Sequence, residues 1–411
     1  MHIAHFTNFY YPVINGVVRS VGAFREAMTE LGHNVFIFAQ HDPNYTDDEP
    51  FIYRYPAIKL PLQVEIPTII PVSPFIDKLL PTLKLDVIHT HHPFLLGQTA
   101  ATKSDDLGVP LVFTFHTQYT DYSHYFPLPQ EAVQSFVKDA IVTWMADFMQ
   151  KCHHIVVPSE SMAEILREGY GLEDQVTAIP TGINLAPYKT ADRDAVRRRH
   201  NWNQDRVVIS VGRLAPEKNF ETLINAVGRI LPRLPDLRLV IIGDGPSRTK
   251  LEKLAEKRGL AGRVEFLGTL PYSEIPAYLK AADLFGFASI TETQGLATME
   301  AQAAGLPVAA VDATGTSDAV THLREGLLTP NSAAALGNAI EKILTDETLR
   351  RRFRAAALEK AATFDISLIT PRLIEVYKQA VIDQKANRKV CLTKSNKLFK
   401  IDWTQIPLLH T

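Results

Sequence analysis

Short apolar runs alternate with longer segments of helical periodicity along most of this chain. In the first half the pattern predicts strands at 2–6, 35–39, 87–90, 111–115, 155–157 and 176–179, and helices near 17–31, 95–107, 128–151 and 160–169. In the second half it predicts strands at 207–211, 237–242, 264–267, 284–288 and 307–311, and helices near 218–232, 247–259, 273–281, 295–304 and 331–345. Strands that alternate with helices are typical of parallel sheets covered by helices.

This alternation predicts an α/β fold with two doubly wound, Rossmann-like domains that face each other across a cleft. A polar stretch at 182–204, which contains Pro187 and a charged run at 192–200, separates the two halves. We therefore expect a first domain over 1–190 and a second over 200–363, with a linker between them. Ligands of such sheets bind at the carboxyl ends of the strands, so the site is expected in the loops that follow strands.

Composition narrows the class of protein. The chain has 411 residues, 46% of them hydrophobic, which is more than a single core normally holds. Its two cysteines, Cys152 and Cys391, exclude a disulfide framework and suit a reducing compartment. The first residues lack a basic signal-peptide start, and the longest apolar region, 60–85, is interrupted by prolines and charged residues. We expect a cytoplasmic protein without a membrane-spanning helix.

Charge is balanced overall but differs between the two halves. Residues 1–190 contain 11 Lys and Arg against 20 Asp and Glu, whereas the remainder contains 32 against 25. The positive second half suits an anionic ligand such as a nucleotide diphosphate, and a solvated surface explains such an imbalance equally well.

The segment 291–300 places two carboxylates, Glu292 and Glu300, on either side of Gly295. It follows a predicted strand and opens a predicted helix, so Gly295, Leu296 and Ala297 are expected at a helix N-terminus. Such an end binds anions, because its first N–H groups lack intrahelical acceptors and the helix dipole is positive there. The segment can thus offer amides to a phosphate and carboxylates to hydroxyls. The alternative is an ordinary amphipathic helix with two solvated glutamates.

Other loops after strands carry charged residues or glycine. Arg213 and Lys218 follow a strand and open a helix, where two cations can clamp a diphosphate or form ordinary surface ion pairs. Gly16 lies between the first strand and the first helix, where a glycine lets a ligand approach the backbone. The loop 243–246, Gly-Asp-Gly-Pro, is a similar case or simply a turn into a helix.

Histidines gather after two strands of the first half. His116 ends the strand 111–115, and a histidine facing a cleft there can bind a sugar hydroxyl or share a proton. A structural role is the alternative. His89, His91 and His92 form a second group, but their spacing does not match a zinc-protease motif, which argues against a metal site.

Together and in this order, these motifs resemble the retaining GT-B glycosyltransferases of family four, over roughly 1–385. Each motif alone is weak, but the ordered set is specific. It comprises Asn15-Gly16-Val17, Phe115-His116-Thr117, Pro158-Ser159, Pro180-Thr181-Gly182-Ile183-Asn184, Gly212-Arg213 with Lys218, Gly243-Asp244-Gly245-Pro246 and Glu292-x7-Glu300. The resemblance implies that helices at about 364–385 cross back to complete the first, acceptor-side domain, and that 200–363 is the donor domain.

The resemblance also implies a hexosyltransferase that takes its sugar from a nucleotide diphosphate, UDP-glucose or UDP-galactose, and retains the anomeric configuration. No Asp-x-Asp motif follows a strand, so we expect a reaction without a metal or another cofactor. We also expect no nucleic-acid partner. By this resemblance, Arg213 and Lys218 neutralise the diphosphate, and its phosphates are held by the amides of Gly295, Leu296, Ala297 and Thr298 and lined from the other domain by Gly16. Glu300 binds the ribose, and Thr269 and Leu270 form the nucleobase pocket. Glu292 holds the transferred sugar, and His116 contacts that sugar near its reacting centre.

The acceptor is less well defined by the sequence. Pro180-Thr181-Gly182 and the stretch 117–125 look closest to the branch that glycosylates diacylglycerol, and the apolar segment 60–85 can form an acceptor wall or a membrane-facing surface, or part of the core. The tail 386–411 mixes basic with apolar residues and suits peripheral contact with the inner face of a membrane, or a disordered end. The acidic first half argues against an anionic membrane.

Four alternatives remain open at this point. A soluble sugar or another small molecule can replace the lipid acceptor. A retaining glycosidase also uses two carboxylates, about 5 Å apart, but has no need of a phosphate-binding helix end. A sugar-nucleotide epimerase shares the architecture, and a non-catalytic module that binds nucleotide sugars would show donor affinity without turnover.

Overall fold

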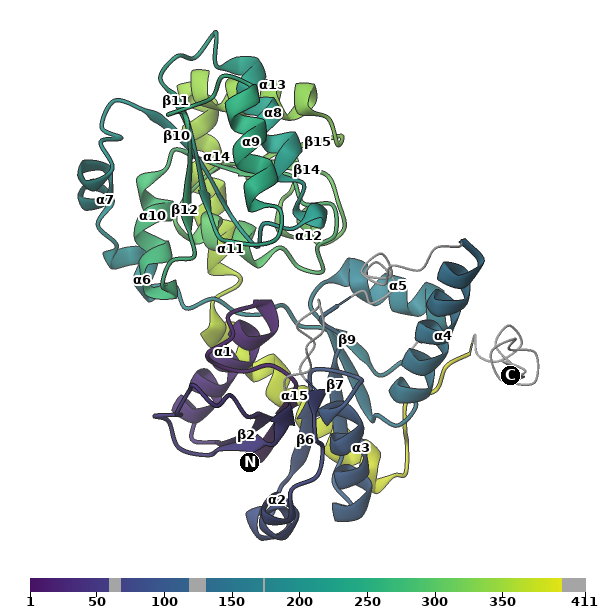
Figure 1. Cartoon of the computed structure of the whole chain (residues 1–411). Coiled ribbons are helices and arrows are strands. Elements are labelled where there is room, and N and C mark those ends of the chain that lie inside the picture. The colour runs from purple at the N-terminus through teal and green to yellow at the C-terminus, as the bar shows by residue number, and fades with distance from the viewer. Residues whose placement is uncertain (59–67, 118–130, 173, 394–411) are drawn as a thin grey trace. The chain divides into compact units, whose positions relative to one another are not determined.

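The computed structural model describes residues 1–58, 68–117, 131–172 and 174–393, the side chains of 131–138 excepted. The chain forms two compact units, each with its own parallel sheet (Figure 1). Unit 1 comprises Met1–Ile179 and the chain from Arg372 on, and unit 2 comprises Pro180–Pro371. The division therefore falls before the stretch 182–204 at which the sequence placed it.

The sheet of unit 1 has the strand order β3-β2-β1-β6-β7-β8-β9, and all neighbours pair in parallel. The chain runs outward from β1 to β3 and then continues on the other side of β1, so the strand order reverses between β1 and β6. The strands are β1 (His2–Thr7), β2 (Asn34–Gln40), β3 (Ile52–Tyr55), β6 (Val87–Thr90), β7 (Leu111–Thr114), β8 (His154–Val157) and β9 (Val176–Ala178). A short antiparallel pair, β4 (Ala57–Ile58) and β5 (Thr68–Ile69), lies outside this sheet.

Helices connect these strands, and several begin at a side-chain cap. Asn15 and Ser159 each accept a hydrogen bond from the backbone N–H three residues later, which explains why α1 and α5 begin where they do. The helices are α1 (Gly16–Glu30), α2 (Pro74–Leu79), the 3₁₀ turn η1 (Leu80–Leu83), α3 (Leu96–Leu107), α4 (Glu131–Met149), α5 (Glu160–Tyr170) and α15 (Ile366–Lys385), whose part from Arg372 on belongs to unit 1.

Unit 2 has the strand order β12-β11-β10-β13-β14-β15, again all parallel, and its order reverses between β10 and β13. Its strands are β10 (Arg206–Val211), β11 (Leu237–Ile242), β12 (Val264–Gly268), β13 (Leu284–Phe287), β14 (Val308–Val311) and β15 (Gly326–Thr329). Val208 belongs to one apolar cluster of buried side chains, whereas its neighbours Val207 and Ile209 belong to another. Side chains alternate between the faces of a strand, so both faces of this sheet are covered, as in a doubly wound fold.

The helices of unit 2 supply the rest of both clusters. One face packs against α8 (Phe220–Ile230), α9 (Arg248–Lys257) and α13 (Ala333–Thr345), and the other against α10 (Ile275–Ala281) and α11 (Leu296–Ala303). The remaining elements are α6 (Ala186–Thr190), α7 (Arg193–Arg199), the 3₁₀ turns η3 (Pro216–Lys218) and η4 (Tyr272–Glu274), α12 (Thr316–Ala319) and α14 (Glu347–Ala362).

The α/β prediction is confirmed, and every predicted strand lies within one residue of a strand in the structure. The stretch 182–204 differs from the expected linker, because it folds as part of unit 2. Trp202 is fully buried, and the buried Arg197 donates to the carbonyl oxygens of Ala281, Trp202 and Asp205. A charged run can therefore be an internal clamp. Among the described residues, no helix has the length and apolar character needed to cross a membrane.

Candidate active site

The loops after β10 and β13 meet at the carboxyl edge of the unit 2 sheet, where its strand order reverses. This is the position at which doubly wound sheets bind ligands. Lys218 follows β10, Glu292 follows β13, and the Lys218 Nζ lies 2.5 Å from the Glu292 Oε1. Both side chains are largely buried, at 22% and 12% exposure, so solvent screens this pair only weakly. Two predicted site residues 74 positions apart thus share one place.

Arg213 lies in the same loop as Lys218 and makes its own ion pair. Its Nη2 donates to the Oε1 of Glu217 at 2.7 Å; the Arg213 side chain is half exposed, and that of Glu217 is buried. The backbone of Glu217 is also held, because its carbonyl accepts from the amide of Ile290, which lies in the loop after β13. The two loops are therefore bound to each other by backbone as well as by charge.

The glycine loop after β11 supports this arrangement. Gly243 and Gly245 have positive φ angles, and a Cβ on either residue would lie within 2.5 Å of a backbone oxygen, that of Gly212 or that of Leu214 respectively. The amide of Leu214 donates to the carbonyl of Asp244. The glycines of the loop 243–246 thus allow it to pack closely against the Arg213 loop, so this loop is more than a turn into a helix.

The expected helix start after β13 is confirmed, with Gly295 as the N-cap of α11. Gly295 has φ 73° and ψ 49°, a left-handed conformation that favours glycine. The Thr298 amide donates to the Gly295 carbonyl at 2.9 Å, so the helix geometry leaves the amides of Leu296 and Ala297 as those without an intrahelical acceptor. The Leu296 and Ala297 side chains pack against the apolar cluster and aim the helix end.

A clamp that the sequence analysis missed holds the loop beside Glu292. The buried Gln294 side chain accepts from the Thr181 amide at 2.9 Å and donates to the Thr181 carbonyl at 3.1 Å. Gly315, with φ +77°, approaches from the loop after β14, and a Cβ there would lie 2.6 Å from the Glu292 carbonyl oxygen. Pro180-Thr181-Gly182, read from the sequence as a mark of the acceptor branch, thus holds the Glu292 loop.

Glu300 lies inside α11 and is 1% exposed. The hydroxyl of Tyr272, from the turn after β12, donates to its Oε1 at 2.8 Å. Thr269 and Leu270, the predicted nucleobase contacts, lie in the same connection, Thr269 exposed and Leu270 partly buried. The structure therefore brings the β12 connection to the buried carboxylate. Tyr272 was not selected from the sequence, although an aromatic residue in a loop after a strand was the available signal.

Unit 1 holds the two remaining predicted site residues. Gly16 is the first residue of α1, next to the Asn15 cap. The loop before it is tied to the loop after β6, because the Asn8 amide donates to His92 Nδ1 at 3.1 Å and Asn8 Oδ1 accepts from the Leu96 amide. Gly16 thus follows β1 at the reversal between β1 and β6, the unit 1 counterpart of the Lys218 position.

His116 follows β7 and is one of a group of packed histidines. The Nε2 of His116 lies 2.9 Å from the Nδ1 of His91, and the Nε2 of His91 lies 2.8 Å from the Nδ1 of His5. His5 faces His89 across the β1–β6 pair, on the sheet face opposite Phe6 and the main core. His89 in turn bonds to the hydroxyls of Tyr377, on α15, and Thr114.

Burial keeps these imidazoles neutral. It lowers the pKa of His5, His92 and His116 to about 3, and the pKa of His89 and His91 falls well below the usual value for the same reason, reinforced by the neighbouring histidines. Ring nitrogens of His5, His89 and His91 lie within 4.8 Å of one another. The sequence identified His89, His91 and His92 as a group but did not predict that His5 joins it, because His5 lies 84 residues away.

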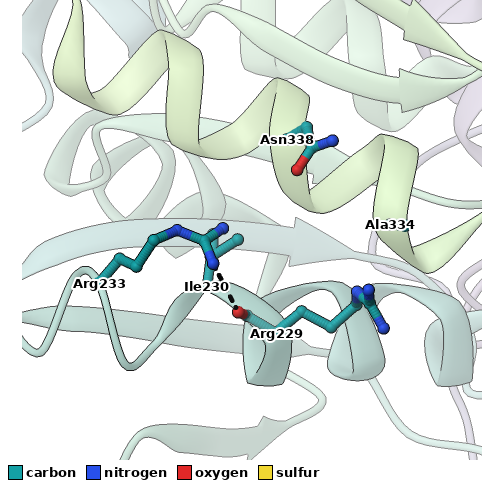
Figure 2. A pocket seen from close by; sticks show the side chains of 5 residues that line it. All are labelled: Arg229, Ile230, Arg233, Ala334 and Asn338. Atoms are coloured by element: carbon teal, nitrogen blue, oxygen red, sulfur yellow. Dashed lines mark hydrogen bonds between the residues drawn. The ribbon is translucent and has the colours of Figure 1, made fainter.

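Some predictions fall outside the described residues. They are the part of the stretch 117–125 beyond Thr117, the part of the apolar segment up to 67, and the tail from 394. A separate cavity of 310 Å³ is lined by residues of α8, its C-terminal turn and α13: Arg229, Ile230, Arg233, Ala334 and Asn338 (Figure 2). Arg233 pairs there with Glu341. The cavity lies on helices rather than in the loops after strands and contains none of the predicted site residues.

Comparison with known proteins finds relatives of both halves of the chain. The model of Glycosyltransferase Family 4 matches residues 14–187, and that of Glycosyl transferases group 1 matches residues 192–360. An alpha-monoglucosyldiacylglycerol synthase of Acholeplasma laidlawii is 31% identical over 75% of this chain and 79% of its own length. A protein of the same name from Streptococcus pneumoniae is 26% identical over 97% and 91%.

Solved structures extend the likeness to the whole fold. Anabaena HepE in complex with UDP and glucose superposes with a TM-score of 0.74 over 92% of this chain and 99% of that one, at 20% identity. An identity this low shows the architecture alone, and that architecture is the two-domain GT-B fold.

Proposed function

Because this chain belongs to family 4 of the retaining glycosyltransferases, which take sugar from a nucleotide donor, we propose that it moves glucose or galactose from the UDP sugar to a hydroxyl of diacylglycerol and forms an α-glycoside. The observation that carries the proposal is the Lys218–Glu292 pair beside the start of α11, at the strand-order reversal of unit 2. A cation, a carboxylate and helix-end amides gathered there suit a sugar diphosphate.

The donor is held by unit 2. Lys218 and Arg213 offset the diphosphate charge, and the amides of Leu296 and Ala297 take phosphate oxygens. Glu300, presented with Tyr272, accepts from the ribose hydroxyls, and the backbone at Thr269 and Leu270 contacts the base. Glu292 accepts from hydroxyls of the sugar to be moved. Binding the donor then exchanges the Lys218–Glu292 contact for one contact with phosphate and one with sugar.

The chemistry follows from where charge develops. Breaking the bond from the anomeric carbon to the diphosphate leaves negative charge on the phosphate oxygens. Preorganised cations and amides stabilise that charge in the transition state. In this proposal they take the place of a metal ion, and the departing phosphate accepts the proton of the acceptor hydroxyl as that oxygen attacks from the same face. Gly16 and His116 of unit 1 contact the phosphates and the sugar near its anomeric carbon.

The lipid acceptor is supported by two observations. The relatives at 31% and 26% identity carry diacylglycerol in their names. In this chain, Ile70 and Val72, between β5 and α2, are 39% and 60% exposed, and Phe75, in the first turn of α2, is 67% exposed. Exposed large apolar side chains within six residues suit contact with acyl chains, so we place the protein on the cytoplasmic face of a membrane, bound peripherally through this segment.

A donor-by-acceptor screen tests the proposal. UDP-glucose, UDP-galactose and GDP-mannose are each offered diacylglycerol in mixed micelles, phosphatidylinositol, or soluble sugars, with EDTA present throughout. We expect an α-linked hexosyl-diacylglycerol from one UDP sugar. Transfer only to soluble sugars would replace the lipid acceptor, and donor isomerised without any acceptor would indicate an epimerase. Donor binding without product from any pair of donor and acceptor would contradict the proposed transferase activity.

Membrane contact has its own test. Wild type and a Val72→Ser, Phe75→Ser double variant are sedimented with liposomes of zwitterionic lipid plus diacylglycerol. We expect the variant to lose most of the bound fraction, because both side chains are exposed and their loss leaves the core intact. Equal sedimentation of the two proteins would remove this segment from the membrane surface.

A further inference from the structure

Three histidines of unit 1 form a continuous hydrogen-bonded chain that ends at His116. His116 Nε2 meets His91 Nδ1 at 2.9 Å, and His91 Nε2 meets His5 Nδ1 at 2.8 Å. The ring planes of His5 and His91 differ by 11°, and those of His91 and His116 by 30°, so neighbouring rings are close to coplanar, as in-plane N–H···N bonds require. Both nitrogens of His91 are therefore used, one toward each neighbour.

The direction of the two bonds is coupled. A neutral imidazole has one N–H donor and one acceptor nitrogen. If His91 donates to His116 it must accept from His5, and if it accepts from His116 it must donate to His5. The pKa lowering by burial keeps all three rings neutral at pH 7, so the chain has only two arrangements.

The far end of the chain selects between them. His5 Nε2 is buried and has no hydrogen-bond partner among the described residues. If His5 accepted from His91, its own proton would lie on that Nε2 as a buried N–H without an acceptor, and unsatisfied buried N–H groups are rare in proteins. If His5 donates through Nδ1, its Nε2 carries only a lone pair. The second arrangement runs from His5 to His91 to His116.

We propose that His5 and His91 are positioning residues that hold His116 as the Nδ1–H tautomer, with its Nε2 accepting from His91. His116 Nδ1 then acts as a hydrogen-bond donor toward any group that it contacts. The inference rests on the proposed function for its catalytic meaning, because there His116 contacts the sugar; a donor at this place supports a sugar oxygen or the oxygen of the leaving group.

His89 provides a matched control within the same cluster. It is as buried as His91, and its ring centroid lies only 4.3 Å from that of His91. Its nitrogens, however, bond to the hydroxyls of Tyr377 and Thr114, so it has no place in the chain to His116. A change at His89 disturbs packing to a similar degree without breaking that chain.

The tautomer is measured directly by long-range ¹H–¹⁵N correlation of histidine-labelled protein, with the His116 signals identified by their loss in His116→Ala. We expect His116 to have a protonated Nδ1 and a bare Nε2 in wild type and in His89→Leu, and averaged nitrogens in His91→Leu. A protonated Nε2 in wild type, or a tautomer unchanged by His91→Leu, would overturn the inference. So would stoichiometric zinc bound through His5, His89 and His91.

Kinetics supply the second readout. We expect His91→Leu to lower kcat by about 10- to 100-fold, by analogy with the loss of a partner that orients a metal-bound histidine, with the donor KM changed less than about threefold. His91→Asn, which can still bond His116 from the Nδ1 position, should recover most of the loss, and His89→Leu should stay near wild type per folded molecule. Equal losses in His91→Leu and His89→Leu would mean a packing effect only.

The two failures are distinguishable. If His116→Ala transfers sugar at the wild-type rate, the proposed role of His116 is wrong. The measured tautomer of His116 in wild type still tests the direction of the hydrogen bonds from His5 through His91 to His116. If His116→Ala is inactive but its tautomer in wild type is Nε2–H, the proposed function stands and this inference is wrong.

Discussion

The two units have related sheets but handle their polar chemistry in opposite ways. Unit 2 contains only His200 and His322 of the 14 histidines, and its candidate site is built on the ion pairs Lys218–Glu292 and Arg213–Glu217. Unit 1 gathers buried, neutral imidazoles at the corresponding edge of its sheet. The difference suits the two tasks of the proposed function, since a diphosphate needs charge whereas a sugar oxygen needs a directed donor or acceptor. One architecture therefore accommodates either solution at its strand-order reversal.

Acidification should separate the units most strongly. His5, His89, His91 and His92 are buried, and burial lowers their pKa below the 6.5 of the unfolded chain. Below pH 6.5 the unfolded state takes up protons that the folded state refuses, so stability falls with pH until the folded pKa is reached. At pH 5.5 the loss of folding stability amounts to about 1.4 kcal/mol per histidine, or about 6 kcal/mol for the four as an upper bound.

Hydrogen exchange followed by mass spectrometry at pH 7.5 and 5.5, corrected for intrinsic exchange rates, resolves the two units. We expect β1, β6 and β7 to lose protection at pH 5.5 and β10, β11 and β13 to keep it. His200→Gln serves as the control, because it removes a histidine from unit 2 and leaves the buried histidines of unit 1 in place. Equal loss in both sheets would break the contrast between the units.

Removing the Lys218 cation of unit 2 should have the largest effect on catalysis. Lys218→Ala leaves the diphosphate charge less compensated and should lower kcat/KM by about 10²- to 10³-fold, as for other groups that stabilise developing charge. Lys250→Ala is the matched control, since Lys250 pairs with Glu221 and its side chain is 73% exposed. Steady-state kinetics compare the two variants. A Lys218 variant within threefold of wild type would place the donor elsewhere.

Removing the carboxylate tests whether the pair divides its work between phosphate and sugar. Glu292→Ala should reduce transfer about 100-fold, whereas the Kd for UDP, which has no sugar, should change less than about threefold. Calorimetric titration with UDP and the transfer assay are run on the same preparation. If UDP affinity falls as much as transfer does, Glu292 acts by supporting Lys218 and not by holding the sugar.

Much of this picture was accessible from the sequence, for identifiable reasons. Buried parallel strands are short apolar runs between helices, so all the predicted strands were confirmed, and Gly295 was correctly placed at a helix start. The stretch around Arg197 was taken for a linker because periodicity does not show that a charged side chain is satisfied by three carbonyls. Partners distant in sequence were also missed. The Gln294–Thr181 clamp and the place of His5 depend on the sheet order, which no spacing encodes.

The smallest predicted effect concerns a neutral group inside the charged site. Tyr272 donates to the buried Glu300 at 2.8 Å, so Tyr272→Phe removes a hydrogen bond to a carboxylate without changing the shape of the ring. If Glu300 binds the ribose, the donor KM should rise about three- to tenfold, because a hydrogen bond of about 1 kcal/mol is lost, with kcat unchanged. Tyr278→Phe is the control, since its hydroxyl bonds to His200 instead. A fall in kcat at constant KM would move Tyr272 and Glu300 from donor binding to the reacting centre, and unit 2 would then combine both kinds of chemistry.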